Sequence, residues 1–157
     1  MITKSRHQQQ VEQFMHLAGQ SVPYIEARLD PKTVELRAKL ILEECLETVR
    51  ALGFTLELRG GIYSDPVDLM GNLDLKATRE VDLIEVIDGC CDIKVVTTGT
   101  LSSFGIPDEA FQTEVDLNNL MKFGPGGYEN KETGKWIKPE SHQPPKIAEI
   151  LEVIKKL

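Results

Sequence analysis

The stretch that decides the fold reads Leu40-Ile41-Leu42-Glu43-Glu44-Cys45-Leu46-Glu47. It lies inside a helical pattern that we expect to begin at Pro31, after the N-cap residue Asp30, and to end before Gly53. Apolar residues of this helix cluster on one face at about 100° per residue. The three carboxylates lie on another face, where they continue a second apolar stripe. We therefore predict a helix that is covered on both sides.

A second acidic pair follows downstream in Glu85-Val86-Ile87-Asp88. Its helical pattern predicts a helix from near Thr78 to Leu101, with small residues such as Gly89 in the middle. Small side chains allow another helix to approach closely. We expect this segment to be the central helix of a bundle.

The rest of the chain is predicted from its periodicity and its turn residues. The further elements are a helix over Gln8 to Gln20, an excursion with a small hairpin over Phe54 to Asp74, a helix opened by Pro107 and closed by Gly124, a turn between short strands over Tyr128 to Lys138, and a helix over Ile147 to Leu157. The predicted fold class is all-α: a four- to five-helix bundle with a small hairpin excursion and a C-terminal tail. Length favours a single domain over residues 1–157.

The amino-acid composition limits the classes of protein to which the chain can belong. A chain of 157 residues with 41% hydrophobic and 6% aromatic residues is typical of a soluble helical domain. Three cysteines cannot form a disulfide framework, and no apolar run approaches the roughly 18 residues of a membrane-spanning helix. We therefore expect reduced thiols, a cytoplasmic location and no membrane partner. The net charge of -7 argues against duplex nucleic acid as a partner, since backbone binding needs a basic face.

The two acidic pairs have the spacing of a shared metal site. Glu44 and Glu47 are three residues apart on one predicted helix, and Glu85 and Asp88 are three apart on the other, so each pair can aim two carboxylates at a common point. Acids this close repel one another and take up protons unless cations compensate. Ligation by oxygen alone favours Mg²⁺, with Mn²⁺ as the alternative, because no His or Cys is spaced to contribute.

Two other interpretations stay open at this point. A ferritin-like di-iron bundle also uses Glu on facing helices, but it needs Glu-x-x-His motifs, which the sequence lacks. The chain could also be a helical regulatory module that binds nucleotide or metal without turning it over.

The motifs resemble those of a known superfamily. Glu43-Glu44-Cys45-Leu46-Glu47 and Glu85-Val86-Ile87-Asp88 resemble the EExxE and ExxD motifs of the all-α NTP pyrophosphohydrolases. This superfamily includes MazG-like proteins, dimeric dUTPases and phosphoribosyl-ATP pyrophosphohydrolases. Asn119-Leu120-Met121-Lys122 is similar to its Asn-x-x-Lys helix, and the tail from Gly134 to Pro145 is similar to that of the MazG-like branch. The stretch over residues 48–84 is longer than the superfamily's usual spacing, which indicates that the excursion from Phe54 to Asp74 is an insertion.

This resemblance implies a MazG-like bundle, an activity and a site. The activity would be Mg²⁺-dependent hydrolysis of a (deoxy)nucleoside triphosphate between its α- and β-phosphates, in a dUTPase-like role that cleans the nucleotide pool. A homodimer or higher homo-oligomer is also implied. The metal ligands would be Glu44, Glu47, Glu85 and Asp88, the residue that orients or deprotonates the attacking water would be Glu43, and the nucleotide-binding residues would be Asn119 and Lys122.

One further acid and three lysines of the tail are additional candidates for functional roles. Asp92, one turn beyond Asp88, is a candidate additional ligand. Lys131, Lys135 and Lys138 in the tail are candidates for a lid over a triphosphate.

Overall fold

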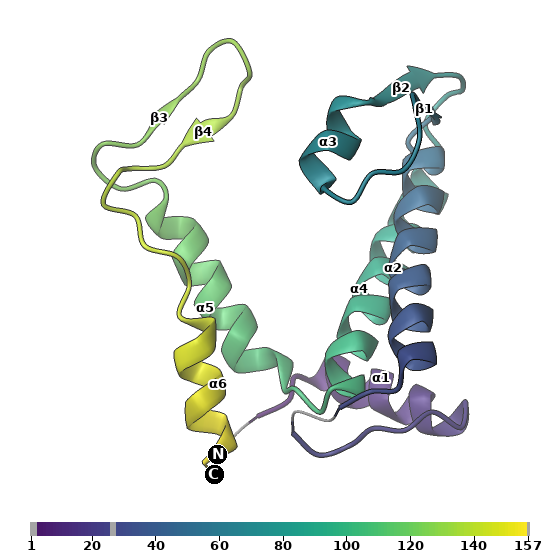
Figure 1. The fold of residues 1–157 in the computed structure, drawn as a ribbon, viewed down its shortest axis with the longest axis vertical. Coiled ribbons are helices and arrows are strands. Elements are labelled where there is room, and N and C mark those ends of the chain that lie inside the picture. Colours follow the sequence, from purple (N-terminus) through teal and green to yellow (C-terminus); the bar gives the residue numbers. More distant parts are fainter. Residues whose placement is uncertain (1–2, 26–27, 157) are drawn as a thin grey trace. The chain divides into compact units, whose positions relative to one another are not determined.

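The structure is a computed structural model that describes residues 3–25 and 28–156, and these residues are mostly helical (Figure 1). They divide into two compact units. One unit is Leu29–Thr100, and the other combines Met1–Arg28 with Leu101–Leu157. The predicted helical content is confirmed, whereas the bundle arrangement and the single domain over residues 1–157 stay predictions.

The unit Leu29–Thr100 is built on two long helices, α2 (Pro31–Ala51) and α4 (Leu83–Ser103) up to Thr100, which lie side by side in Figure 1. Asp30 caps α2 as predicted, because its Oδ1 accepts hydrogen bonds from the backbone N of Lys32 at 3.0 Å and of Thr33 at 3.1 Å. The helix ends before Gly53, whose φ of +91° favours glycine. Local signals in the sequence therefore set both ends of α2.

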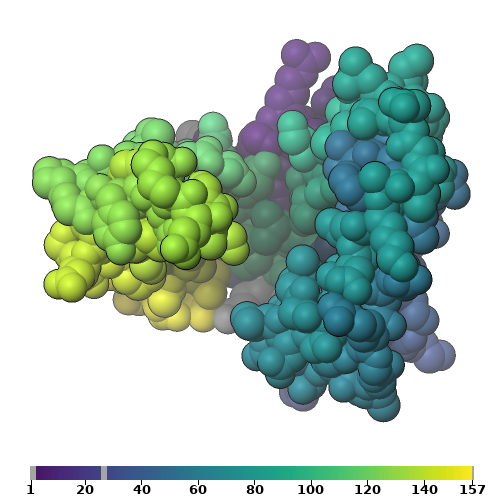
Figure 2. Space-filling model, turned by 90° about the horizontal axis from the view of Figure 1, so that it is seen from above, coloured from purple at the N-terminus to yellow at the C-terminus, as the bar shows by residue number. Residues whose placement is uncertain are grey.

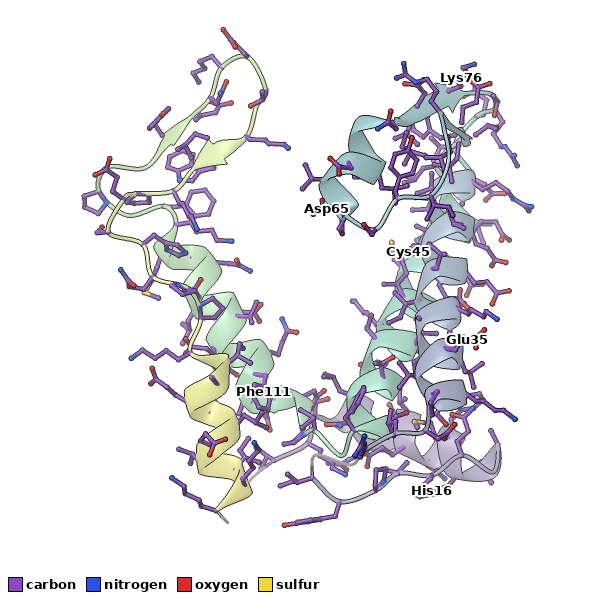
Figure 3. The ribbon with its side chains drawn as sticks, in the orientation of Figure 1. His16, Glu35, Cys45, Asp65, Lys76 and Phe111 are labelled. Atoms are coloured by element: carbon purple, nitrogen blue, oxygen red, sulfur yellow. The ribbon has the colours of Figure 1, made fainter. Side chains whose placement is uncertain are left out.

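The excursion between the two long helices contains the expected hairpin. Strands β1 (Phe54–Leu58) and β2 (Leu73–Ala77) pair in antiparallel register, with Phe54 opposite Ala77. A short helix, α3 (Pro66–Gly71), which the sequence pattern did not predict, lies between them. Asp65 stands at its start, and its Oδ1 accepts a hydrogen bond from Val67 N at 2.6 Å (Figure 3).

The helix that carries Glu85 and Asp88 was predicted to start near Thr78. This prediction is wrong, since α4 begins at Leu83. The backbone N–H groups of Thr78 and Arg79 donate to Gly53 O at 2.9 and 3.3 Å, which holds them at the base of the hairpin. Asp82 then caps the helix, with its Oδ1 accepting from Glu85 N at 3.3 Å. A tertiary backbone contact thus delays the helix.

The other unit contains α1 (Arg6–Leu17), α5 (Asp108–Met121), β3 (Tyr128–Glu129), β4 (Trp136–Ile137) and α6 (Ile147–Lys155). Gln8 is fully buried and ties α1 to the start of α5. Its Nε2 donates to Ser102 Oγ at 3.0 Å and to Ile106 O at 2.8 Å, and its Oε1 accepts from Asp108 N at 2.8 Å. Helix α6 contacts α5, and in Figure 2 the yellow atoms of the C-terminal segment lie beside green atoms of the same unit. The predicted strand pair in the tail is confirmed.

In the described residues, no helix is both long and apolar enough to cross a bilayer. All three cysteines lie in the described part of the chain and are free thiols. Several large apolar side chains of α4 are exposed, among them Ile84 at 79% and Ile87 at 58%.

Candidate active site

A pocket of about 490 Å³ lies along α2 and α4, within the unit Leu29–Thr100. This volume falls in the usual range of small-ligand sites, roughly 300 to 1,000 Å³. The residues that line the pocket are Glu47, Arg50, Ala51, Arg79, Glu80, Asp82, Glu85, Asp88, Gly89 and Asp92.

The pocket brings together acids from both sequence motifs. Glu47 comes from α2, whereas Glu85 and Asp88 come from α4. Asp92, the candidate additional ligand, lines the same pocket. The i, i+3 spacing on α4 keeps its acids on one side of the helix, and the packing of α4 on α2 brings Glu47 to them.

Glu44 is half-buried and Glu43 is exposed, and neither is a lining residue of the pocket. Burial raises the pKa of the Glu44 carboxyl above its usual value of 4.5, and the nearby carboxylates of Asp92, Glu47, Glu43 and Asp88 raise it further. Negative charge from both helices therefore gathers around Glu44. A bound cation would relieve this repulsion.

As they stand, no three His, Cys, Asp or Glu side chains of residues 3–25 and 28–156 are grouped closely enough to hold a metal ion. The donor set nevertheless suits Mg²⁺, which prefers oxygen ligands and commonly keeps several waters while one or two carboxylates bind it directly. The acids of the pocket fit such a partly hydrated ion.

Asn119 and Lys122 lie in the other unit, at the end of α5. Lys122 Nζ donates to Asn119 Oδ1 at 2.6 Å. The neighbouring Asn118 is buried, and its Nδ2 donates to Gln143 O at 2.8 Å, which fastens the tail to α5. Burial lowers the pKa of His142, and the positive charges of Lys138 and Lys122 lower it further. Positive charge therefore gathers beside the Asn-x-x-Lys motif.

The tail hairpin packs on the end of α5. Trp136 Nε1 donates to Lys122 O at 2.6 Å, and its ring lies against Phe123 with 4.9 Å between the ring centroids. The candidate lid residues Lys131, Lys135 and Lys138 are all exposed, and Lys131 pairs with Glu129.

Sequence reasoning missed the four charged lining residues Arg50, Arg79, Glu80 and Asp82. The spacing of Arg50 could have predicted its place, because it lies three residues after Glu47 and therefore on the same side of the helix. Arg79 had no such signal, since it reaches the pocket only through the closure of the hairpin.

The family profile described as phosphoribosyl-ATP pyrophosphohydrolase matches residues 11–119, which is more than half of the chain. The chain belongs to this family. It is therefore a pyrophosphohydrolase, a hydrolase that acts on phosphoanhydride bonds of a nucleotide. The family lies in the MazG-like NTP pyrophosphohydrolase superfamily, so the resemblance stated from the motifs is confirmed. No curated protein matches the sequence.

The match to the phosphoribosyl-ATP pyrophosphohydrolase family includes both acidic motifs and ends at Asn119. Lys122 and the tail therefore lie outside it. Membership in a family of hydrolases argues against the regulatory module without turnover and against the di-iron bundle.

Proposed function

We propose that this pyrophosphohydrolase cleaves a (deoxy)nucleoside triphosphate between its α- and β-phosphates with Mg²⁺, releasing the monophosphate and pyrophosphate. The observation that carries the proposal is the pocket that Glu47 of α2 lines together with Glu85 and Asp88 of α4. A polyanionic substrate needs bound cations to enter a pocket rich in carboxylates, and Mg²⁺ is a cation that carboxylate oxygens hold well. The family supports the reaction class, and the pocket supports its location.

The proposed metal ligands are Glu44, Glu47, Glu85 and Asp88, with Mn²⁺ as the alternative ion and Asp92 as a further ligand. When bound, Mg²⁺ neutralises phosphate charge and lowers the pKa of water. Glu43 is exposed and lies about 100° around α2 from Glu44. This position suits a carboxylate that orients or deprotonates the attacking water.

Asn119 and Lys122 are proposed to bind the nucleotide, because an amide and an ammonium group can donate hydrogen bonds to sugar and phosphate oxygens. We expect a deoxynucleotide substrate and a dUTPase-like role in cleaning the nucleotide pool. Phosphoribosyl-ATP is the second candidate substrate, since the description of the matching family names it.

A cytoplasmic homodimer or higher homo-oligomer is also proposed. Ile84 and Ile87 are exposed on α4 beside Glu85 and Asp88, and contiguous exposed apolar side chains commonly mark protein interfaces. Light scattering coupled to gel filtration should give at least twice the chain mass of 17.6 kDa. A monomer would contradict this part of the proposal.

The reaction is tested by incubating the protein with the common dNTPs, NTPs and phosphoribosyl-ATP in Mg²⁺ and identifying the products by ³¹P NMR. We expect a nucleoside monophosphate and pyrophosphate from a triphosphate, loss of turnover with a chelator and recovery with added Mg²⁺. Release of orthophosphate, or no turnover of any triphosphate, would contradict the proposal. Turnover of phosphoribosyl-ATP alone would favour the second candidate.

A further inference from the structure

The pocket contains two cations among its carboxylates. Arg50 lies in the last turn of α2, and Arg79 lies in the link between β2 and α4. Both side chains are exposed. Within the described part of the chain, neither guanidinium makes a hydrogen bond or an ion pair. Their donors are available to an anionic ligand.

The two arginines lie at the same end of the pocket. α2 and α4 run antiparallel, because Ala51 O accepts from Asp82 N at 2.9 Å while Gly89, further along α4, packs on Thr48. The C-terminal end of α2, with Arg50, therefore adjoins the start of α4, which Arg79 precedes.

Glu80 and Asp82 lie close to Arg79 in the sequence, whereas the carboxylates of α4 extend away from the arginines. At about 1.5 Å per helical residue, Asp88 and Asp92 lie about 9 and 15 Å from Asp82 along α4. The pocket thus has one end that holds both arginines, together with Glu80 and Asp82, and this end is followed by a run of carboxylates without arginine. Asp82, at the end with the arginines, is engaged as the helix cap through Ile84 N and Glu85 N.

The hairpin between the acidic motifs holds Arg79 at this end of the pocket. Gly53 O accepts the backbone N–H of Arg79 at 3.3 Å, and a Cβ on Gly53 would lie 2.5 Å from Arg79 O. The two backbone segments are therefore in direct contact, and the hairpin of β1 and β2 closes onto the end of α2. The closure of the hairpin thus holds a cation at the pocket.

We infer that Arg50 and Arg79 bind the β- and γ-phosphates of the substrate, the part that leaves as pyrophosphate, while the α-phosphate lies at the carboxylates. Guanidinium groups match phosphate oxygens in a bidentate geometry, which makes arginine suited to this role. The inference rests on the proposed function. The order of groups along the pocket, arginines and then the carboxylates of α4, corresponds to the order of the phosphates along the substrate.

The cleavage step is balanced in this arrangement. The oxygen of water forms a bond to the α-phosphorus, and the bond from that phosphorus to the bridging oxygen breaks. Pyrophosphate leaves with the electron pair of the broken bond, and a proton of the water passes to the proposed base Glu43. The arginines stabilise the negative charge that develops on the leaving group.

The test is calorimetric titration of the full chain with inorganic pyrophosphate, and separately with a nucleoside monophosphate, in Mg²⁺. Arg79→Gln and Arg50→Gln should each weaken pyrophosphate binding about tenfold and change monophosphate binding less than about twofold. The matched control is Arg59→Gln, because Arg59 lies outside the pocket, where its Nη2 donates to Asp74 Oδ1 at 3.1 Å. This control should leave both affinities unchanged. Each variant is checked for a native thermal transition.

Two results would overturn the inference. One is pyrophosphate affinity that stays within about twofold in both Arg79→Gln and Arg50→Gln, or wild-type protein that does not bind pyrophosphate. The other is loss of monophosphate binding in place of pyrophosphate binding, which would reverse the orientation. Wild-type turnover separates the two claims: a protein that hydrolyses triphosphates but whose variants bind pyrophosphate normally contradicts only this inference.

Discussion

Gly89 of α4 packs directly against Thr48 of α2: a Cβ on Gly89 would lie 2.4 Å from Thr48 Oγ1 and 3.2 Å from its Cβ. Thr48 is buried, and its Oγ1 donates to Glu44 O at 2.7 Å. This contact lies one residue from Asp88 on one helix and one residue from Glu47 on the other. It therefore sets the separation of the two acidic motifs.

Gly89→Ala is expected to destabilise the protein by about 1 kcal/mol. Overpacking of a tight contact costs about 1–3 kcal/mol, which exceeds the roughly 1 kcal/mol that alanine gains over glycine in helix propensity. The free energy of unfolding in urea measures the change. Thr48→Ala is expected to lower the free energy of unfolding less in the Gly89→Ala background than in the wild type. In that background, removal of the Thr48 hydroxyl also relieves its overlap with the new Cβ at position 89. Additive effects, or a more stable Gly89→Ala protein, would contradict the close contact.

Much of the fold follows from local signals, and the exceptions have tertiary causes. Asp30 and Gly53 act at the ends of α2 through contacts within a few residues, so the sequence predicts its bounds well. The start of α4 was predicted at Thr78 because the apolar pattern extends that far, but Gly53 O binds the backbone of Thr78. No local pattern contains that contact.

Some residues of the candidate site were likewise predictable from local spacing, whereas others depend on tertiary packing. Glu85 and Asp88 share a side of α4 because of their spacing, which the sequence reveals directly. Whether Glu44 lines the pocket depends on how α2 is rotated about its own axis, and packing decides that rotation. Arg79 reaches the pocket through the hairpin closure, so sequence reasoning could not place it there.

Gly53→Ala should cost about 2 kcal/mol of folding stability. The backbone at Gly53 has φ +91°, where a Cβ is strained by about 1–2 kcal/mol, and the Cβ would also overlap Arg79 O at 2.5 Å. Thermal unfolding monitored by circular dichroism measures the loss. Gly61→Ala is the control, since nothing lies within 4 Å of its Cβ. Equal stability of the Gly53→Ala and Gly61→Ala variants would contradict the close backbone contact between Gly53 and Arg79.

Glu44→Gln is expected to raise the melting temperature at neutral pH in the absence of metal. Because the pKa of Glu44 is raised above 4.5 in the folded protein, the folded state binds the proton more tightly than the unfolded chain. The stabilising contribution of the protonated carboxyl is complete below 4.5 and is lost as the pH rises through the raised pKa. Glutamine mimics the neutral form and avoids this loss.

Melting temperatures between about pH 4 and pH 8 measure this difference. Glu35→Gln is the matched control on the same helix, because Glu35 is exposed and pairs with Lys39 Nζ at 2.5 Å (Figure 3). Added Mg²⁺ should stabilise the wild type more than Glu44→Gln. Identical pH profiles for Glu44→Gln and the wild type would show that Glu44 is not in a crowded acidic environment.

Phe123→Ala is expected to shift the tryptophan emission to longer wavelength. Trp136 is the single tryptophan of the chain, and its ring lies 4.9 Å from that of Phe123, so removal of the phenyl group exposes it to water. Phe14→Ala, an exposed site on α1, should leave the spectrum unchanged. An unshifted spectrum in Phe123→Ala would contradict the packing of the tail on α5.

The most direct test of the central claim is pyrophosphate release from the preferred triphosphate by Glu47→Gln and Asp88→Asn, compared with Glu35→Gln. Both pocket variants should lose turnover by about a hundredfold or more while they keep a native thermal transition, and the control should keep wild-type turnover. Turnover within about twofold of the wild type in either pocket variant would contradict a site formed by the acids of α2 and α4.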